Sequence, residues 1–325
     1  MIELTHSVEV ERGTLLPTCL VLLACICFGT IPYFAKSLTD AGMAPYSVAF
    51  YRYGLSATIL LPLLLRVPPH LWRTAAWGIL SGASIGLGWI GFVYALKTVP
   101  VSTLGVLYMT YPVFTLLIGW IWFRDLPSKR ALSGALMVVM AALIASSPAA
   151  IEAHHLPAML ISLTAPITFG FGINVLIHRL TPLKAIVRVA TFSFGASISL
   201  IPLMLLSEPG TVTPQNNDDW WLIVGLAFGT ALLPQLVYSF FAPMIGAARA
   251  SVAGSVELPT MFFVGWFLLG ENIGLVQWIA CLLITLAIVM TPARATRNLS
   301  TQMVLPTKAT SKTRATRLSD IWFDD

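Results

Sequence analysis

The sequence predicts an all-α integral membrane protein with ten transmembrane helices in two inverted five-helix repeats. Its composition, its regularly spaced apolar stretches and a similarity between its halves support this. Of the 325 residues, 57% are hydrophobic and 10% are charged, whereas soluble globular domains carry roughly 25% charged residues. The mean hydropathy is +0.83. This composition excludes a large soluble enzyme, a nucleic-acid-binding module and a disulfide-stabilised secreted domain.

Long apolar stretches predict the ten crossings. Each holds about 20 residues, which as a helix cross roughly 30 Å of hydrocarbon. We predict crossings at residues 15–35, 45–65, 74–96, 101–123, 131–147, 157–177, 186–206, 220–241, 247–269 and 275–291. Proline or other turn-type residues stand in most of the gaps, where each helix must stop. Because the gaps are short, no second globular domain fits.

Lysine and arginine predict the orientation, because cytoplasmic loops carry the positive excess. With the amino terminus inside, all 19 such residues except Lys36, Arg52 and Lys97 fall on the inner side. Lys97 lies at an outer helix end, where we interpret it as an interfacial anchor. We therefore expect a multi-pass protein of the cell (inner) membrane with both termini in the cytoplasm.

The two halves of the sequence resemble each other. Residues 28–54 match residues 169–195 at a spacing of 141, with Phe-Gly at the start and Gly at the end. Residues 94–125 match residues 240–271 at a spacing of 146, with tryptophan and an acidic residue at equivalent positions. The predicted organisation is a cytoplasmic tail at 1–14, five-helix repeats at 15–148 and 155–292, and a basic, disordered cytoplasmic tail at 293–325.

The odd number of helices in each repeat predicts how the halves are related. After five crossings the second copy enters the membrane from the opposite side, so a pseudo-twofold axis in the membrane plane relates the two. Inverted repeats of this kind are typical of secondary transporters, whose substrate site lies near the bilayer midplane between the halves. We therefore expect a transporter that works by alternating access.

Several motifs carry a family resemblance. They are Tyr94-Ala-Leu-Lys-Thr-Val-Pro, Tyr111-Pro112, Glu257-Leu-Pro, Gly270-Glu271 and Gln277-Trp278. These motifs resemble the EamA-type repeat of the drug/metabolite transporter (DMT) superfamily over roughly residues 20 to 291. The resemblance implies ten helices in inverted repeats and export of small metabolites, often amino acids or related solutes. The sequence departs from the pattern at Tyr111, where many members have glutamate, and at Arg124, where glycine is usual, so no single substrate is implied.

Glu257 is the main candidate for substrate binding. Ionisable groups inside the hydrocarbon are costly, so they normally face a cavity or a partner. Glu257 lies about ten residues into its predicted span, which is roughly 15 Å at the helical rise per residue. We interpret it as a proton-coupling group or as the group that holds a substrate amine. The alternative is a buried structural carboxyl that is bonded to neighbouring helices.

Arg52 is the second charged candidate, about seven residues and roughly 10 Å from the outer end of its span. Its planar guanidinium suits bidentate binding of a substrate carboxylate. Two alternatives stay open. Arg52 can form a structural ion pair with Glu257, or its long side chain can reach the outer interface.

Aromatic and amide side chains complete the predicted substrate site. Those placed to line one cavity with the two charged residues are Tyr33, Trp89, Tyr94, Tyr108, Tyr111, Asn174, Gln235 and Tyr238. The repeat makes Tyr111 the counterpart of Glu257 and Tyr33 the counterpart of Asn174. An aromatic wall with one acid and one arginine suits a small zwitterion that carries an apolar or aromatic group. The alternative is that the tyrosines form interfacial belts or pack between helices.

Proline and glycine inside the predicted spans indicate where helices bend and pack. Each proline removes a backbone hydrogen bond and can loosen its helix, which a rocking mechanism needs. These prolines are Pro32, Pro112, Pro166, Pro234 and Pro259. Glycines spaced to allow close helix packing are Gly82, Gly86, Gly88, Gly91, Gly225 and Gly229.

Motifs for catalysis, nucleotide binding or metal binding are not found. The sequence has no Walker-type loop, no Gly-x-Ser-x-Gly and no His-Glu-x-x-His. Its four cysteines lie inside apolar spans, and His154 and His155 are neighbours in a loop. We therefore predict no cofactor, no metal site and no nucleic-acid partner. The expected partners are the lipid bilayer and a small-molecule substrate, and the oligomeric state is not predicted.

The leading hypothesis is secondary active export of small metabolites, with amino acids or related zwitterions as substrates and proton coupling as an option. A second hypothesis is efflux of lipophilic cations, in which Glu257 and the aromatic residues bind the positive charge and Arg52 is structural. A hypothesis of another class is a non-transporting membrane scaffold or an intramembrane enzyme. An enzyme would need several polar groups at one depth, and the sequence offers one acid without an acid-base partner.

Overall fold

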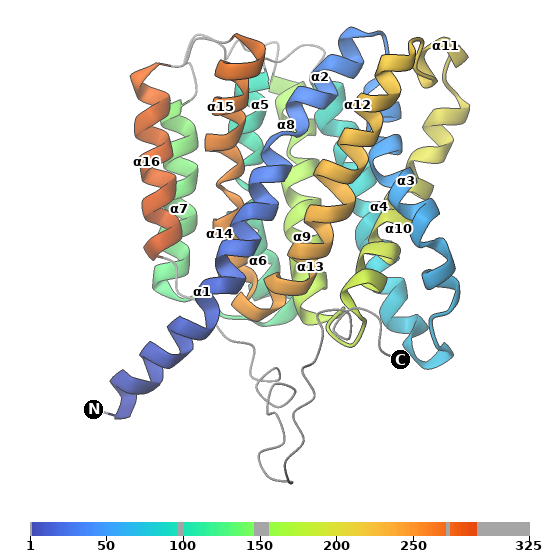
Figure 1. Cartoon of the computed structure of the whole chain (residues 1–325). Helices are drawn as coiled ribbons and strands as arrows, with labels where there is room; N and C mark the ends of the chain where they lie inside the picture. The colour runs from blue at the N-terminus through green and yellow to red at the C-terminus, as the bar shows by residue number, and fades with distance from the viewer. Residues whose placement is uncertain (1, 96–100, 146–155, 271–273, 291–325) are drawn as a thin grey trace, which may run out of the picture. The chain divides into compact units, whose positions relative to one another are not determined.

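The computed structural model describes residues 2–95, 101–145, 156–270 and 274–290, and these residues form helices and turns without a strand (Figure 1). The α-helices are α1 (Ile2–Gly29), α2 (Ile31–Asp40), α3 (Pro45–Leu65), α4 (Trp72–Ala95), α5 (Val101–Tyr108), α6 (Tyr111–Phe123), α7 (Lys129–Ala145), α8 (Leu156–Ser162), α9 (Thr164–His178), α10 (Ala185–Leu205), α11 (Pro209–Val212), α12 (Asn217–Ala227), α13 (Leu233–Ile245), α14 (Ala247–Gly254), α15 (Glu257–Leu269) and α16 (Leu275–Met290). A 3₁₀ turn, η1 (Pro69–Leu71), and a π-helical turn, η4 (Phe228–Leu232), complete them.

The predicted all-α class is confirmed, and each predicted crossing contains helix. Seven described stretches are long and apolar enough to span a membrane: Leu15–Asp40, Pro45–Leu65, Pro69–Phe92, Leu156–His178, Ala185–Leu205, Asn217–Ile245 and Ala247–Leu268. The fourth predicted crossing contains the shorter helices α5 and α6, the fifth contains α7, and the tenth contains α16. Residues 2–14, expected as a tail, form the first half of α1. Lys97, His154, His155 and the tail 293–325 lie outside the described residues.

Five predicted crossings are interrupted, and each interruption lies just before a proline. One or two non-helical residues separate the two helices in each of the pairs α1/α2, α5/α6, α8/α9 and α14/α15, and the π turn η4 joins α12 to α13. The prolines stand at the second or third residue after the interruption and are Pro32, Pro112, Pro166, Pro234 and Pro259. A proline in the first turn of a helix lacks an N–H that would be unpaired anyway. An interruption of the regular α-helix thus accompanies each of these five prolines.

Glycines on α4 let it pack closely against α10 and α9. A Cβ on Gly82 would lie 2.0 Å from the carbonyl oxygen of Phe192, and one on Gly88 would lie 2.9 Å from that of Thr164. The Thr164 hydroxyl also donates a hydrogen bond to the Gly88 carbonyl oxygen at 3.0 Å. The predicted packing role is confirmed here but is wrong for Gly229, where a Cβ would meet nothing within 4 Å.

We expect Gly82→Ala to destabilise the protein by about 1–3 kcal/mol, because the new methyl group would force α4 away from the backbone of α10. Thermal unfolding of the detergent-purified protein measures this. The matched control is Gly210→Ala, where the Cβ would meet nothing within 4 Å. Equal melting temperatures for the two variants would contradict the expectation.

Candidate functional site

A cavity of about 420 Å³ is enclosed by helices from both halves of the chain, α1–α5 from the first and α9, α10, α12, α13 and α15 from the second. Its aromatic lining consists of Phe28, Tyr53, Trp89, Phe92, Tyr108, Phe169 and Phe192. Its polar and charged lining consists of Lys36, Thr39, Asp40, Arg52, Gln235 and Glu257. A mainly apolar cavity of this size with a few polar groups is typical of small-molecule sites.

The cavity has an exposed end and a buried end. The exposed end, which we call the mouth, is formed by the second half of α2, where Lys36 and Asp40 are exposed. We call the opposite end, toward which α6 and α9 run, the base. There the fully buried Tyr111 packs behind the cavity wall, with its ring centroid 5.4 Å from that of Tyr108.

Glu257 is the first residue of α15, at the interruption between α14 and α15. Its side chain is 3% exposed and lines the cavity. None of the described residues donates a hydrogen bond to its carboxyl group or forms an ion pair with it. The partial positive charge at a helix N-terminus favours an acidic side chain at this position. The carboxyl group is therefore available to an amine, another cation or a proton that enters the cavity.

Arg52 is held in the cavity wall by two hydrogen bonds. Its Nη2 donates to the carbonyl oxygen of Thr230 in η4 at 2.9 Å, and its Nη1 donates to the hydroxyl of Tyr53 at 3.2 Å. The guanidinium carbon lies 5.0 Å from the ring centroid of Tyr53 and 5.8 Å from that of Trp89. Although Arg52 and Glu257 line the same cavity, they do not form the ion pair that was one alternative. Each Nη carries a second hydrogen, so Arg52 can still donate to a ligand.

The predicted binding residues divide into two groups. Those that line the cavity are Glu257, Arg52, Trp89, Tyr108 and Gln235. Those that do not are Tyr111, Tyr94, Tyr33, Asn174 and Tyr238. Tyr94 is 55% exposed. Tyr111 and Tyr238 are buried one layer behind the lining, with ring centroids 5.0 Å from Phe169 and 6.1 Å from Phe28, respectively.

The mouth adds residues to the predicted site. Lys36, Thr39 and Asp40 are spaced three and four residues apart, so they share one face of α2, and all three line the cavity. That helical spacing of polar residues is the sequence signal that identifies them. Tyr33, on the same helix, instead packs against the ring of Phe34, with centroids 5.3 Å apart.

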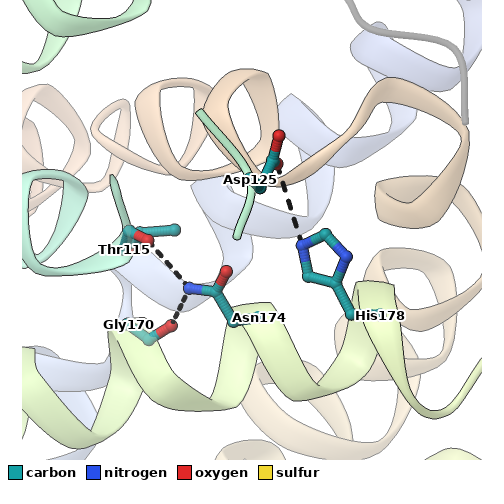
Figure 2. Close-up of polar contacts among 5 residues, drawn as sticks. All are labelled: Thr115, Asp125, Gly170, Asn174 and His178. Carbon is teal, nitrogen blue, oxygen red and sulfur yellow. Dashed lines mark hydrogen bonds and ion pairs between the residues drawn. The ribbon is translucent and has the colours of Figure 1, made fainter. Parts of the chain in front are cut away.

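Asn174 joins α9 to α6 at the base (Figure 2). Its Nδ2 donates to the carbonyl oxygens of Thr115 at 2.8 Å and of Gly170 at 2.9 Å. One turn further along α9, the His178 imidazole lies 3.8 Å from the Asp125 carboxylate. That distance is too long for a hydrogen bond, and the contact is an ion pair when the imidazole is protonated. Because Asn174 is fully buried, its amide contacts the neighbouring helix and not the cavity.

The profile of the EamA-like transporter family matches residues 15–147 and 156–292. The chain belongs to this family. The predicted resemblance to the EamA-type repeat of the drug/metabolite transporter superfamily is thereby confirmed. With its many apolar helices, this EamA-like transporter is a multi-pass membrane protein.

Similar proteins bear transporter names. The chain is 27% identical over 214 residues to a riboflavin transporter of Brucella anthropi, covering 65% of this chain and 69% of that protein. It is 24% identical over 295 residues to the uncharacterized transporter YcbK of Bacillus subtilis, covering 84% of this chain and 90% of that protein. A solved crystal structure superposes with a TM-score of 0.68 at 17% identity, covering 84% of this chain and 96% of that one. At that identity, the superposition shows a shared fold alone.

Proposed function

We propose that this EamA-like transporter is a secondary active exporter of small zwitterions with an aromatic or apolar group, such as amino acids, and that it works by alternating access. The observation that carries this is the cavity, in which aromatic side chains lie around the carboxyl group of Glu257, which pairs with none of the described residues, and around the fixed guanidinium of Arg52. Glu257 would hold the amino group of the solute. The free Nη hydrogens of Arg52 would hold its carboxylate, and the rings would cover its apolar group.

We further propose that the ten predicted crossings form two inverted five-helix repeats. A twofold axis requires helices near it to contact their own counterparts. Two such pairs are in contact, α3 with α10 as the second helices of the halves, and α7 with α16 as the fifth. The two separate family matches, one in each half, also support the repeat. By the distribution of lysine and arginine, the base faces the cytoplasm, as do both termini, and the mouth faces outward.

Glu257 also supports proton coupling. A buried carboxyl group without a fixed partner can hold either a proton or the solute amine, and competition between the two couples their movements. Transport driven by a proton gradient across liposomes tests this. Flux that is independent of the gradient would leave exchange or facilitated diffusion as the mode of transport.

A second candidate substrate is a flat, uncharged heteroaromatic compound. The aromatic lining favours it, because stacked rings interact well with aromatic side chains. One relative is named a riboflavin transporter. In this case the rings contribute most of the binding, and Glu257 and Gln235 contribute hydrogen bonds. Lipophilic cations are a further candidate class of substrate, because Glu257 and the aromatic rings can bind positive charge.

Flux and binding measurements on one set of compounds separate these candidates. The purified protein is tested with phenylalanine, riboflavin and tetraphenylphosphonium by thermal shift, since a ligand stabilises the native state in proportion to its occupancy, and then by uptake into liposomes. We expect phenylalanine to stabilise the protein and to cross the bilayer. Flux of riboflavin or tetraphenylphosphonium alone would replace the zwitterion assignment, and no binding of any compound would favour a scaffold or an enzyme.

A further inference from the structure

Lys36 and Asp40 of α2 are a second set of opposite charges in the cavity. We call them the mouth pair, and we call Arg52 and Glu257 the inner pair. Both sets line the cavity, but the mouth pair is exposed and the inner pair is buried. The side chains of Lys36 and Asp40 form no ion pair or hydrogen bond with each other or with any other described residue. Zwitterion binding by the inner pair leaves the charges of the mouth pair without a role.

The packing of α2 directs the mouth pair toward the cavity. Leu38 is fully buried in a core cluster with residues of α3 and α12. Lys36 and Asp40 lie about 40° apart around the helix axis, and each lies about 160° from Leu38. Phe34, one turn before Leu38, contacts α12, where a Cβ on Gly225 would lie 2.7 Å from the Cε1 of the Phe34 ring. Because this face of α2 is fixed against α3 and α12, the opposite face holds the mouth pair at the cavity.

An apolar stretch of wall separates the two pairs. On α2, Pro32 and Ala35 line the cavity on the inner side of the mouth pair. On α3, Val48 and Ala49 line it on the outer side of Arg52. Arg52 lies seven residues after the first residue of α3, which is about 10 Å along the helix axis. The cavity thus has a charged pair at each end and apolar side chains between them.

Each pair contains one cation and one anion, so each complements the ammonium and carboxylate groups of one α-amino acid. We propose that the mouth pair is a second binding subsite and that the solutes are bis-amino acids, in which a short apolar chain joins two α-amino-acid groups. The inner pair holds one end of the solute. At the other end, Asp40 binds the ammonium group and Lys36 binds the carboxylate, while the apolar chain contacts the wall between. This inference rests on the zwitterion binding proposed above and narrows its substrate class.

The size of the cavity agrees with a solute that has two ends. Its volume of about 420 Å³ lies within the range of sites that hold drug-sized ligands, roughly 300–1,000 Å³. A solute that the inner pair alone holds would leave the mouth pair facing water. Because the mouth pair is exposed, water and salt screen its charges, so the second subsite adds less affinity than the buried inner pair.

A matched pair of compounds tests the second subsite on the purified full-length protein. α,α′-Diaminosuberate carries an α-amino-acid group at both ends, and α-aminooctanoate has the same carbon chain with that group at one end only. We expect diaminosuberate to bind more tightly by roughly threefold to tenfold, as measured by isothermal titration calorimetry. The preference should decrease at high ionic strength, because the charges that cause it are exposed.

A double variant, Lys36→Gln with Asp40→Asn, removes both charges of the mouth pair and keeps the approximate shape of the side chains. It should lose the preference for diaminosuberate and bind the two compounds with similar affinity. The matched control is Lys129→Gln with Asp218→Asn, because Lys129 and Asp218 are exposed and do not line the cavity. The control should keep the preference of the parent.

The outcomes separate this inference from the proposed function. Equal affinity of the parent for the two compounds, or a preference that the double variant retains, would overturn the second subsite. If phenylalanine still binds in that case, zwitterion binding by the inner pair stands and only the second subsite fails. If neither phenylalanine nor either of the two test compounds binds, both proposals fail.

Discussion

Glu257→Gln is expected to weaken binding of a zwitterion by about 2–4 kcal/mol, which is roughly 30-fold to 1,000-fold in affinity. The amide has nearly the shape of the carboxyl group but no negative charge to pair with the solute amine. Because no described residue pairs with Glu257, the variant loses no internal ion pair, and we expect little change in melting temperature without ligand. Binding of phenylalanine and its flux into liposomes measure the effect.

The matched control for this prediction is Glu208→Gln. Glu208 is exposed just before α11 and does not line the cavity. Its variant should bind and transport as the parent does. If Glu257→Gln also transported phenylalanine at the parental rate, the role assigned to this carboxyl group would be wrong, although the fold would not be affected. Retained flux without any response to a proton gradient would assign Glu257 to coupling alone.

Arg52→Ala is expected to have two effects, because Arg52 has both structural and binding contacts. It leaves the buried carbonyl oxygen of Thr230 without its donor, so we expect a loss of about 1–3 kcal/mol in the free energy of unfolding. It also removes the partner of the solute carboxylate, and zwitterion flux should fall at least tenfold. Arg52→Lys keeps the charge but cannot reach both acceptors, so an intermediate loss is expected.

Thermal unfolding and flux of two solutes separate the effects of Arg52→Ala. The matched control is Arg66→Ala, because Arg66 is exposed at the end of α3. If the Arg52→Ala variant melts at a lower temperature but transports phenylalanine at the parental rate, then Arg52 has a structural role only. If tetraphenylphosphonium were then transported at the parental rate, the lipophilic-cation hypothesis would be favoured over the zwitterion.

The positions of the helices could be predicted from the sequence because the signals are local. Apolar stretches of sufficient length define the crossings, and proline in the first turn after an interruption explains why α1/α2 and α14/α15 are discontinuous. Glu257 was identifiable because a lone carboxyl group in a long apolar stretch requires a cavity or a partner. Arg52 was identifiable for the same reason.

The rotation of each helix about its axis could not be predicted equally well. A helix that is apolar on all sides gives no hydrophobic face from which to choose its orientation. Trp89 lines the cavity while Tyr94, five residues later on α4, is exposed, because five residues turn a helix by about 140° beyond a full turn. The contact of Asn174 with the Thr115 carbonyl oxygen depends on how α6 meets α9, which no local pattern encodes.

The π turn η4 determines which side of α13 faces the solute. A π turn holds one residue more than the α-helical turn that it replaces. If the same residues, Phe228–Leu232, were wound as ordinary α-helix instead, everything after them would be rotated about the helix axis by about 100°. Gln235 would leave the wall, and the acceptor that anchors Arg52 would be displaced with it. The local geometry of this region thus depends on the winding of one short segment more than on the chemistry of its side chains.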